Sequence, residues 1–544
     1  MSTYQGSRGS KRPRRRSRWF LAGGLVAGSL VAGAAGLTAV TALAAEPDLA
    51  APSPPGSAAL LQSDAPGPGW APEERGEDQQ SPEWQPDAGD NTGAVAERPD
   101  GATAGGPDGR TSARPSETAT GRPTGGNGRQ PEHPAYPVPC DSARLIAALV
   151  RANAEGGATL RLAEKCTYTL THAFQQRDEY DGGIRDAREA NDAAEAPGDA
   201  EAPKRNPADD KTGLPVIYHA ITIEGSGASI VRGVHAEDFR FFTVRDGGEL
   251  TLRNVTLRNG RSTGEGGSIH IVHGATAVVE RVTVVNSTSL SAEEGGGGIF
   301  NDGNLQISDS TLVGNRAAGT TGKGGGLLNG GVMTMYRTEF RHNSAVSYGG
   351  GMANFRAAGD IYSSTFVRNN AGQGGGLASF SARTKVFDIA VVGNSAETGG
   401  GLAVSDAVMV ARQSTFRDNV ATVKGGGISV VQGLLPLDDS VVVGNTTRGN
   451  GGGIYAEKSN VLVRTSDVEE NEAVGKQSKG AGLYVTAGST SLYKSRVIGN
   501  RSTVKAGGIQ AERAQVRIDD ESVVISNSPT NCEGSKVPIA HCFR

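Results

Sequence analysis

Three consecutive copies of one repeat decide the fold. They read GGGLLNGGVMTMYRTEFRHN at 324–343, GGGMANFRAAGDIYSSTFVRN at 349–369 and GGGLASFSARTKVFDIAVVGN at 374–394. Each copy begins with glycines before an aliphatic residue and ends on an asparagine that follows an apolar residue by three positions. Because a repeat of about 20 to 50 residues is typical of solenoids and other repeat folds, this pattern indicates a repeat architecture.

The asparagine marker continues in both directions, at steps of 25 to 29 residues. Its members are Asn315, Asn343, Asn369, Asn394, Asn419, Asn445, Asn471, Asn500 and Asn527. Equivalent positions of successive coils stack, so we expect these side chains to form a ladder of amides along one turn. We expect the apolar residue three positions earlier to fill the interior. A shorter second ladder is predicted for Asn301, Asn329 and Asn354.

The period also selects the kind of solenoid. About 30 residues are needed for a βαβ unit, so the repeat is too short for one, and its glycines are unsuited to helices. Short alternating apolar runs predict three strands of about three to five residues per copy. Connections between parallel strands favour the right-handed sense. The sequence therefore predicts an all-β fold, a right-handed parallel β-helix solenoid of about 11–13 coils with a short N-terminal helical cap.

Composition narrows the function classes. The 544 residues include 79 glycines, only 5% are aromatic, and the formal net charge is −4. The charge excludes a strongly basic nucleic-acid binder, so we expect no nucleic-acid partner. Four cysteines are too few for a disulfide-dense scaffold.

The start of the chain has the pattern of an export signal, which we assign to residues 1–44. Seven basic residues precede an uncharged run from Trp19 to Ala44, and Ala42-Leu43-Ala44 resembles a cleavage site. The rival interpretation is an uncleaved membrane anchor, because the run is long enough to span a bilayer. Arg15-Arg16 leaves both the general and the twin-arginine export routes open. Cleavage would change the net charge from −4 to −11, and we expect an extracellular or surface-anchored protein.

The remaining boundaries follow from changes in composition. They predict a disordered Pro/Gly/Ala-rich linker at 45–136, an N-terminal cap at 137–174, an acidic low-complexity insertion at 175–213, the β-helix at 214–527 and a C-terminal disulfide cap at 528–544. Residues 46–139 hold 17 of the 25 prolines and lack a sustained hydrophobic period. Such a segment cannot bury enough apolar surface to offset its conformational entropy.

The cysteines are expected to close the two ends of the solenoid. Loop lengths favour the pairs Cys140–Cys166 and Cys532–Cys542, and each would cap an open hydrophobic cross-section. Export makes such bonds possible. Metal binding by Cys532, His541 and Cys542 would lack a fourth ligand at usable spacing. We therefore expect no metal and no cofactor.

Variation in coil length is confined to the turn between the asparagine and the next glycines. The insertions 287–296, 316–323 and 472–479 all fall there, so they are expected to project from one edge of the solenoid. In repeat proteins the edge that carries the insertions is often the binding face. The alternative is that this turn simply tolerates change best.

The Gly-Gly-Gly-aliphatic element with Phe340-Arg-His-Asn343, Phe366-Val-Arg-Asn369 and Phe416-Arg-Asp-Asn419 carries a resemblance to known proteins. It is similar to the right-handed β-helix superfamily of pectate-lyase-like secreted proteins, and to polymorphic outer-membrane proteins with GG-[AG]-[ILV] and FxxN repeats. The resemblance covers roughly 215–527. It implies the fold but not one function, because a single solenoid supports many functions.

Catalytic residues cannot be assigned from this resemblance. The arginine-centred sequence of pectate lyases has no match between 214 and 527. Among the motifs of polygalacturonases, only the Asp-Asp pair has a match, at Asp438-Asp439. His270 and His273 are three residues apart in a strand, so we expect them on opposite faces, as outward surface histidines.

These observations predict a secreted or surface-tethered, monomeric protein that presents a binding or adhesive surface. The expected partner is a polysaccharide, a cell-surface glycan or other envelope material. Two alternatives remain open. One is a polysaccharide lyase or glycoside hydrolase with a non-standard site, and the other is a passive structural protein of the envelope.

Overall fold

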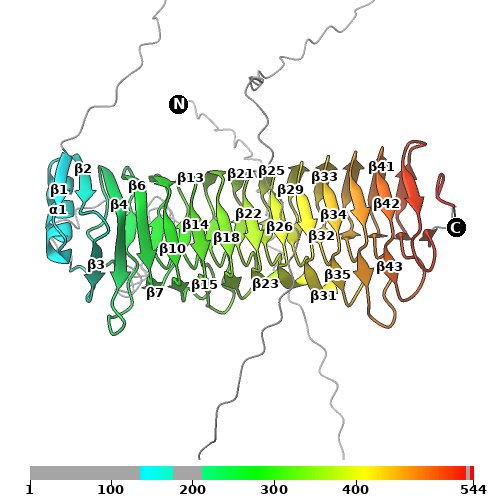
Figure 1. The fold of residues 1–544 in the computed structure, drawn as a ribbon, viewed down its shortest axis with the longest axis horizontal. Coiled ribbons are helices and arrows are strands. Elements are labelled where there is room, and N and C mark those ends of the chain that lie inside the picture. Colours follow the sequence, from blue (N-terminus) through cyan, green and yellow to red (C-terminus); the bar gives the residue numbers. More distant parts are fainter. Residues whose placement is uncertain (1–134, 176–210, 535–538, 544) are drawn as a thin grey trace, which may run out of the picture. The chain divides into compact units, whose positions relative to one another are not determined.

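The computed structural model describes residues 135–175, 211–534 and 539–543. In these residues the chain is a parallel β-solenoid of about 14 turns with one short helix. Figure 1 shows the coils stacked in chain order from β1 to the C-terminal strands. The all-β fold class is thereby confirmed. Residues 1–134, which include the predicted export signal and almost all of the predicted linker, lie outside the described residues. Residues 176–210 of the predicted insertion also lie outside them.

Three parallel sheets run along the described part of the solenoid. The 12-stranded sheet contains β5 (Phe242–Val244), β8 (Ile269–Ile271), β12 (Ile299–Asn301), β16 (Leu327–Asn329), β20 (Met352–Phe355), β24 (Leu377–Phe380), β28 (Leu402–Ser405), β32 (Ile428–Val431), β36 (Ile454–Glu457), β40 (Leu483–Thr486), β44 (Ile509–Glu512) and β47 (Cys532–Glu533). The 10-stranded sheet contains β7 (Arg261–Ser262), β11 (Thr288–Ser289), β15 (Arg316–Ala317), β19 (Ser344–Ala345), β23 (Asn370–Gln373), β27 (Ser395–Thr398), β31 (Val420–Lys424), β35 (Thr446–Thr447), β39 (Glu472–Ala473) and β43 (Arg501–Ser502).

The 25-stranded sheet takes two strands from most coils. It contains β1 (Ala135–Val138), β2 (Gly157–Leu162), β3 (Thr167–Leu170), β4 (Ala220–Arg232), β6 (Glu249–Arg258), β9 (Thr276–Glu280), β10 (Thr283–Val285), β13 (Asn304–Ser308), β14 (Thr311–Val313), β17 (Val332–Tyr336), β18 (Glu339–Arg341), β21 (Ala358–Tyr362), β22 (Thr365–Val367), β25 (Arg383–Phe387), β26 (Ala390–Val392), β29 (Val408–Arg412), β30 (Thr415–Arg417), β33 (Leu434–Asp438), β34 (Val441–Val443), β37 (Asn460–Arg464), β38 (Asp467–Glu469), β41 (Ser489–Tyr493), β42 (Arg496–Ile498), β45 (Gln515–Ile518) and β46 (Val523–Ile525).

Two details differ from the sequence prediction. A typical coil has four strands rather than three, as in β16, β17, β18 and β19. The extra division lies between β17 and β18, where Arg337 takes a left-handed backbone conformation and bends the chain. There are also about 14 turns rather than 11–13. The first turns, built from β1 to β4, lack the glycine and asparagine markers on which the count rested.

The N-terminal end is closed by α1 (Ser142–Ala154). Its first turn is capped by the side chain of Asp141, which accepts a hydrogen bond from the Arg144 backbone at 2.9 Å. Leu145 and Leu149 are fully buried against the first coils. The helix therefore covers a hydrophobic cross-section that would otherwise face water.

The interior is a stack of apolar columns. Phe340 and Phe366 occupy equivalent positions in paired strands, their side chains are fully buried, and their rings stack with centroids 5.0 Å apart. Phe416 is buried two coils further on. Alternation along each strand sends these residues inward and their neighbours outward.

Each glycine of the repeated triplet has its own steric role, as the copy at 324–326 illustrates. Gly324 has φ +62°, a conformation that side chains disfavour. A Cβ on Gly325 would lie 2.3 Å from the Gly350 carbonyl oxygen, and one on Gly326 would lie 2.8 Å from the Phe340 ring. The chain therefore turns sharply, passes close to the backbone of the next coil and meets a buried ring, and all three positions require glycine.

The structure brings the predicted asparagines together as a continuous buried ladder. Asn369 is typical: its Oδ1 accepts from the backbone and the Nδ2 of Asn343, at 2.9 and 3.1 Å. Its own Nδ2 donates to the Phe340 carbonyl at 3.0 Å and to Asn394 Oδ1 at 3.0 Å. The same pattern runs from Asn315 to Asn527, and it satisfies amides that would be costly to bury unpaired.

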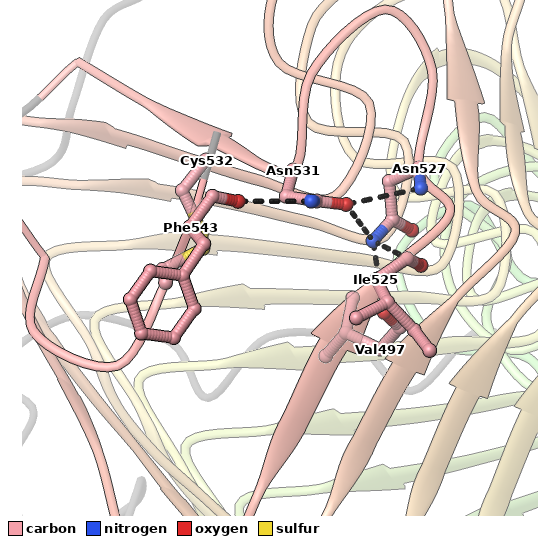
Figure 2. Close-up of a disulfide and its surroundings, with 7 residues drawn as sticks. Val497, Ile525, Asn527, Asn531, Cys532 and Phe543 are labelled. Carbon is pink, nitrogen blue, oxygen red and sulfur yellow. Dashed lines mark hydrogen bonds between the residues drawn. A yellow bond between two sulfur atoms is a disulfide. The ribbon is translucent and has the colours of Figure 1, made fainter.

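The ladder ends on a residue that the sequence pattern did not mark. Asn531 Oδ1 accepts from the backbone and the Nδ2 of Asn527, both at 3.1 Å, and Asn531 Nδ2 donates to the Phe543 carbonyl at 2.9 Å. Figure 2 shows this connection beside the Cys532 disulfide. The C-terminal segment is thus tied to the last coil both through a side-chain amide and through the Cys532–Cys542 bond.

Candidate functional site

Three aromatic residues form a row on the outer face of the 25-stranded sheet. Tyr336, Tyr362 and Phe387 end β17, β21 and β25, and the strand registers pair Tyr336 with Tyr362 and Tyr362 with Phe387. Alternate residues of these strands are buried in the core, so the aromatic residues face outward. Phe387 is 41% exposed. We call this set the aromatic row.

The first two rings of the aromatic row, Tyr336 and Tyr362, overlap only partly. The Tyr336 and Tyr362 centroids are 5.0 Å apart with planes inclined by 12°. Since rings in face-to-face contact lie only about 3.5–4 Å apart, this separation indicates an offset stack, which leaves a strip of each ring uncovered. Burial, with the nearby charge of Asp360, raises the pKa of the Tyr362 phenol, so it remains a neutral donor at physiological pH.

A cationic group follows the row in the next coil. Arg412 is paired in register with Phe387, and its Nε lies 3.4 Å from an Asp438 oxygen. Asp438 is also held by Arg464, through two hydrogen bonds of 2.7 and 2.6 Å. One carboxylate thus faces two guanidinium groups, and 58% of the Arg412 side chain is exposed. The aromatic row therefore ends beside the partly exposed guanidinium group of Arg412.

The starts of the same strands line a shallow groove of about 490 Å³. Its polar lining comes from Arg356, Ser381, Arg383 and Asp406. Along the same strands, between groove and aromatic row, Lys385 approaches Asp360 at 3.8 Å. The face of β17, β21, β25 and β29 thus combines aromatic rings with hydroxyl, carboxylate and cationic groups, the mixture that a polar organic ligand requires.

The edge that carries the insertions presents a second groove, of about 550 Å³, on the 10-stranded sheet. It extends from Arg316 across Ser344, Asn370 and Ser395 to Val420, beside the insertion 316–323. None of the residues that line it is aromatic. Asn370 Nδ2 already donates to Ser395 Oγ at 2.8 Å. This groove is therefore a weaker candidate than the face of the aromatic row.

Six titratable residues form a charged seam where the 10-stranded and 12-stranded sheets meet. The set is Lys424, Tyr455, Glu457, Lys479, Tyr484 and Glu512. Glu457 accepts from Tyr455 at 2.9 Å and from Lys424 at 3.1 Å. The two tyrosine rings stack 5.4 Å apart and are only 8% and 7% exposed.

The charges of the seam are already satisfied. The hydrogen bond from Tyr455 lowers the pKa of Glu457, against its partial burial and with help from Lys424. Burial and the hydrogen bond to Glu457 raise the pKa of Tyr455. A lowered carboxyl pKa and a raised phenol pKa leave neither group adjusted to exchange a proton at neutral pH. We interpret the seam as a structural closure of the corner.

The predicted surface location of His270 is wrong. His270 lies on the outer side of β8 but is half-buried, with its ring 5.0 Å from Phe300 and its Nδ1 3.3 Å from an Arg240 donor. Burial, reinforced by Arg240, holds the pKa of His270 well below its usual range. Arg240, which precedes β5, contacts His270 from outside. Strand periodicity does not reveal this contact. His273 is exposed.

The cysteines and possible metal ligands can be placed directly. Cys140 is bonded to Cys166, and Cys532 to Cys542. Within the described residues, no cluster of three or more His, Cys, Asp or Glu side chains could hold a metal ion. Asp438, half of the Asp438-Asp439 pair noted in the sequence, is occupied by its two arginines.

Sequence reasoning missed the aromatic row although a signal was present. Tyr336, Tyr362 and Phe387 each precede a ladder asparagine by seven residues. The same interval falls on Arg412, Asp438 and Arg464 in the next copies and on an aromatic residue again only at Tyr493, so the aromatic signal covers only three consecutive coils. A search confined to residues repeated in every copy does not detect it.

The fold and this open face define the protein as a parallel β-solenoid with an aromatic row on one sheet. No protein-family model matches the sequence, and no curated protein matches it.

Among solved structures, the A-module of mannuronan C-5 epimerase AlgE4 from Azotobacter vinelandii is similar, with a TM-score of 0.36, 11% identity, and coverage of 72% of this chain and 95% of that chain. A mutant of the periplasmic alginate epimerase AlgG has a TM-score of 0.33 and 10% identity, over 57% of this chain and 78% of that chain. The A-module of mannuronan C-5 epimerase AlgE6 from A. vinelandii has a TM-score of 0.31 and 13% identity, over 73% and 96%. At these scores the likeness carries no inference about substrate or chemistry.

Proposed function

We propose that this protein is an exported β-solenoid that binds polysaccharide on the outer face of β17, β21, β25 and β29. The observation that carries the proposal is the aromatic row. Sugar rings present apolar C–H faces and polar hydroxyl edges, so they bind where exposed aromatic rings adjoin hydrogen-bonding and charged groups. Tyr362 and Phe387 supply the rings, and Lys385, Asp360 and Arg412 supply the polar groups around them.

Several features support export. The basic and apolar pattern of residues 1–44 is that of a signal segment. Two disulfides, with no free cysteine in the described residues, suit an oxidising compartment. Independently of export, no helix in the described ranges is long and apolar enough to cross a bilayer.

The test uses the full chain against a panel of immobilised neutral and acidic polysaccharides and isolated cell walls. We expect retention of the unaltered chain on at least one of them, and loss of retention for the double variant Tyr362→Ala, Phe387→Ala. Tyr493→Ala is the matched control, because Tyr493 (47% exposed) is an aromatic residue in the same outward column with an exposure close to that of Phe387. Arg412, Asp438 and Arg464 separate it from the aromatic row.

Two results would contradict the proposal. Retention of no glycan by the unaltered chain would exclude polysaccharide binding. Equal loss in the double variant and in Tyr493→Ala would exclude the assigned face. Release of reducing or unsaturated sugars during the assay would instead favour a polysaccharide-degrading enzyme.

A further inference from the structure

We infer that the bound glycan is a linear chain that lies parallel to the solenoid axis, with successive sugar units over successive coils. This inference rests on the proposed function and specifies the shape of its ligand. The aromatic row is built from Tyr336, Tyr362 and Phe387, which belong to neighbouring strands in direct register. A line through them therefore crosses the strands and follows the axis.

The spacing of the row suits a polymer. Paired strands lie about 4.8 Å apart, and the centroids of Tyr336 and Tyr362 are 5.0 Å apart. This interval is comparable with the length of one sugar unit in an extended chain of equatorially linked six-membered rings. Each aromatic ring can therefore contact one sugar unit without a change of register, which a branched or helical glycan would not permit.

A glycan chain that ran across the solenoid axis would contact different side chains. Along β25, the residues that face outward with Phe387 are Lys385 and Arg383, both of them exposed and charged. The next aromatic ring in the same coil is that of Phe380, at the end of β24 beyond the turn, and it stacks on Phe355 rather than on the aromatic row. The apolar surface is therefore continuous only along the axis.

The row has two defined ends. On the N-terminal side Tyr336 is paired with Ser308, and on the C-terminal side Phe387 is paired with Arg412. Neither neighbour carries an aromatic ring, so the stacking surface is three coils long. We therefore expect affinity to increase with chain length over about three sugar units and then to level off. Beyond this length, added units extend over surface without rings.

The experiment is a titration calorimetry series. It uses the full chain and purified linear oligosaccharides of one to eight units, prepared from whichever panel polysaccharide is retained. Removing one ring contact should lower affinity about two- to tenfold. Phe387→Ala removes an end ring, so affinity should level off about one unit earlier. Tyr362→Ala removes the central ring and should weaken every oligosaccharide that spans it.

Two further variants separate ring contact from general disruption. Tyr362→Phe keeps the aromatic ring, so its affinity should stay within about twofold of that of the unaltered chain. Normal binding by this variant would show that the weaker binding of Tyr362→Ala comes from the lost ring. Tyr493→Ala should leave the whole length series unchanged. Circular dichroism of each variant reports on the solenoid itself.

The outcomes distinguish this inference from the proposed function. A rise with length that levels off near three units, and earlier for Phe387→Ala, supports it. If affinity is already maximal for a single sugar unit, the protein recognises chain ends, and this inference alone is overturned. The same holds if Phe387→Ala does not change the oligosaccharide length at which affinity levels off. Retention of no polysaccharide overturns the proposed function and this inference with it.

Discussion

At the scale of single residues, the fold depends on positions where no other side chain fits. Asn394 is fully buried, yet each of its polar atoms is paired: its Oδ1 accepts from Asn369, and its Nδ2 donates to the Phe366 carbonyl and to Asn419. Because an unpaired buried amide costs about 1–3 kcal/mol, the ladder is self-consistent only when every coil contributes an asparagine. This explains why the column runs unbroken from Asn315 to Asn527.

Gly350 shows the steric side of the same constraint. A Cβ there would lie 2.4 Å from the carbonyl oxygens of both Asn370 and Gly375, and these are backbone atoms that cannot rotate away. Gly350→Ala should therefore destabilise the protein by about 3 kcal/mol, measured as a lower urea midpoint. The matched control is Gly233→Ala. Its Cβ would meet only ordinary contacts from 3.4 Å outward and its φ is not in the left-handed region, so its stability should be almost unchanged.

These residue-level requirements could be predicted from sequence because they recur in every coil. A position that must stack on its own copy is constrained in the same way each time, so the asparagine and glycine columns are visible without a structure. Arg412 and Asp438 behave differently. They interact between coils with unlike residues, and no periodic signal marks such a contact.

A loss of stability in Gly233→Ala as large as that in Gly350→Ala would contradict the steric explanation. In that case the glycine content would matter through backbone conformation in general rather than through close approach.

At the scale of elements, the turns decide how the sheets meet. The 10-stranded and 12-stranded sheets are joined through the triplet glycines, and the charged seam closes the corner between them. Lys424 and Lys479 each pair with a glutamate 33 residues further along the chain, one coil away in the stack. The variable turn could be placed from the sequence, but this pairing could not. Lys424 ends β31 and Lys479 lies in the loop after β39, whereas both glutamates end strands of the 12-stranded sheet.

The seam gives the protein a specific response to acid. The pKa of Glu457 is lowered in the folded protein, mainly by the hydrogen bond from Tyr455. A lowered folded-state pKa means that the carboxylate contributes stability above its unfolded value of 4.5, and that this contribution is lost as the pH falls through the folded value. Glu457→Gln should therefore be less stable than the unaltered chain at pH 7, and the difference should shrink by about pH 3.

Chemical denaturation at pH 7, 5 and 3 measures this difference. Glu397→Gln is the control, because Glu397 is an exposed carboxylate on the 10-stranded sheet. A Glu457→Gln deficit that stays constant across the three pH values would show that the charge of Glu457 is not what stabilises the corner.

At the scale of the whole molecule, the regular solenoid was predictable and the face with the aromatic row was not. The period excluded helices and βαβ units, and the structure confirms the parallel solenoid. The count of strands per coil was wrong because the bend at Arg337 divides what reads as one strand. The aromatic row went unnoticed because it occupies three coils only, so it contributes nothing to the repeat that defines the fold.

The same contrast bears on function. A repeat tells which residues hold coils together, whereas a binding site is a local departure from the repeat. Tyr336, Tyr362 and Phe387 are such a departure, since the equivalent positions before and after them are Ser308 and Arg412. The insertions at 287–296 and 316–323 are a departure of another kind, but the groove beside them lacks aromatic rings.

Hydroxyl-radical footprinting of the full chain, with and without the polysaccharide it retains, is the most direct test of glycan binding at the aromatic row. Exposed aromatic side chains react with hydroxyl radicals, so each serves as its own reporter. We expect bound glycan to protect Tyr336, Tyr362 and Phe387 and to leave Tyr493 as reactive as before. Unchanged reactivity at the aromatic row, with protection of Arg316, Ser344 and Asn370 on the 10-stranded sheet instead, would contradict this expectation.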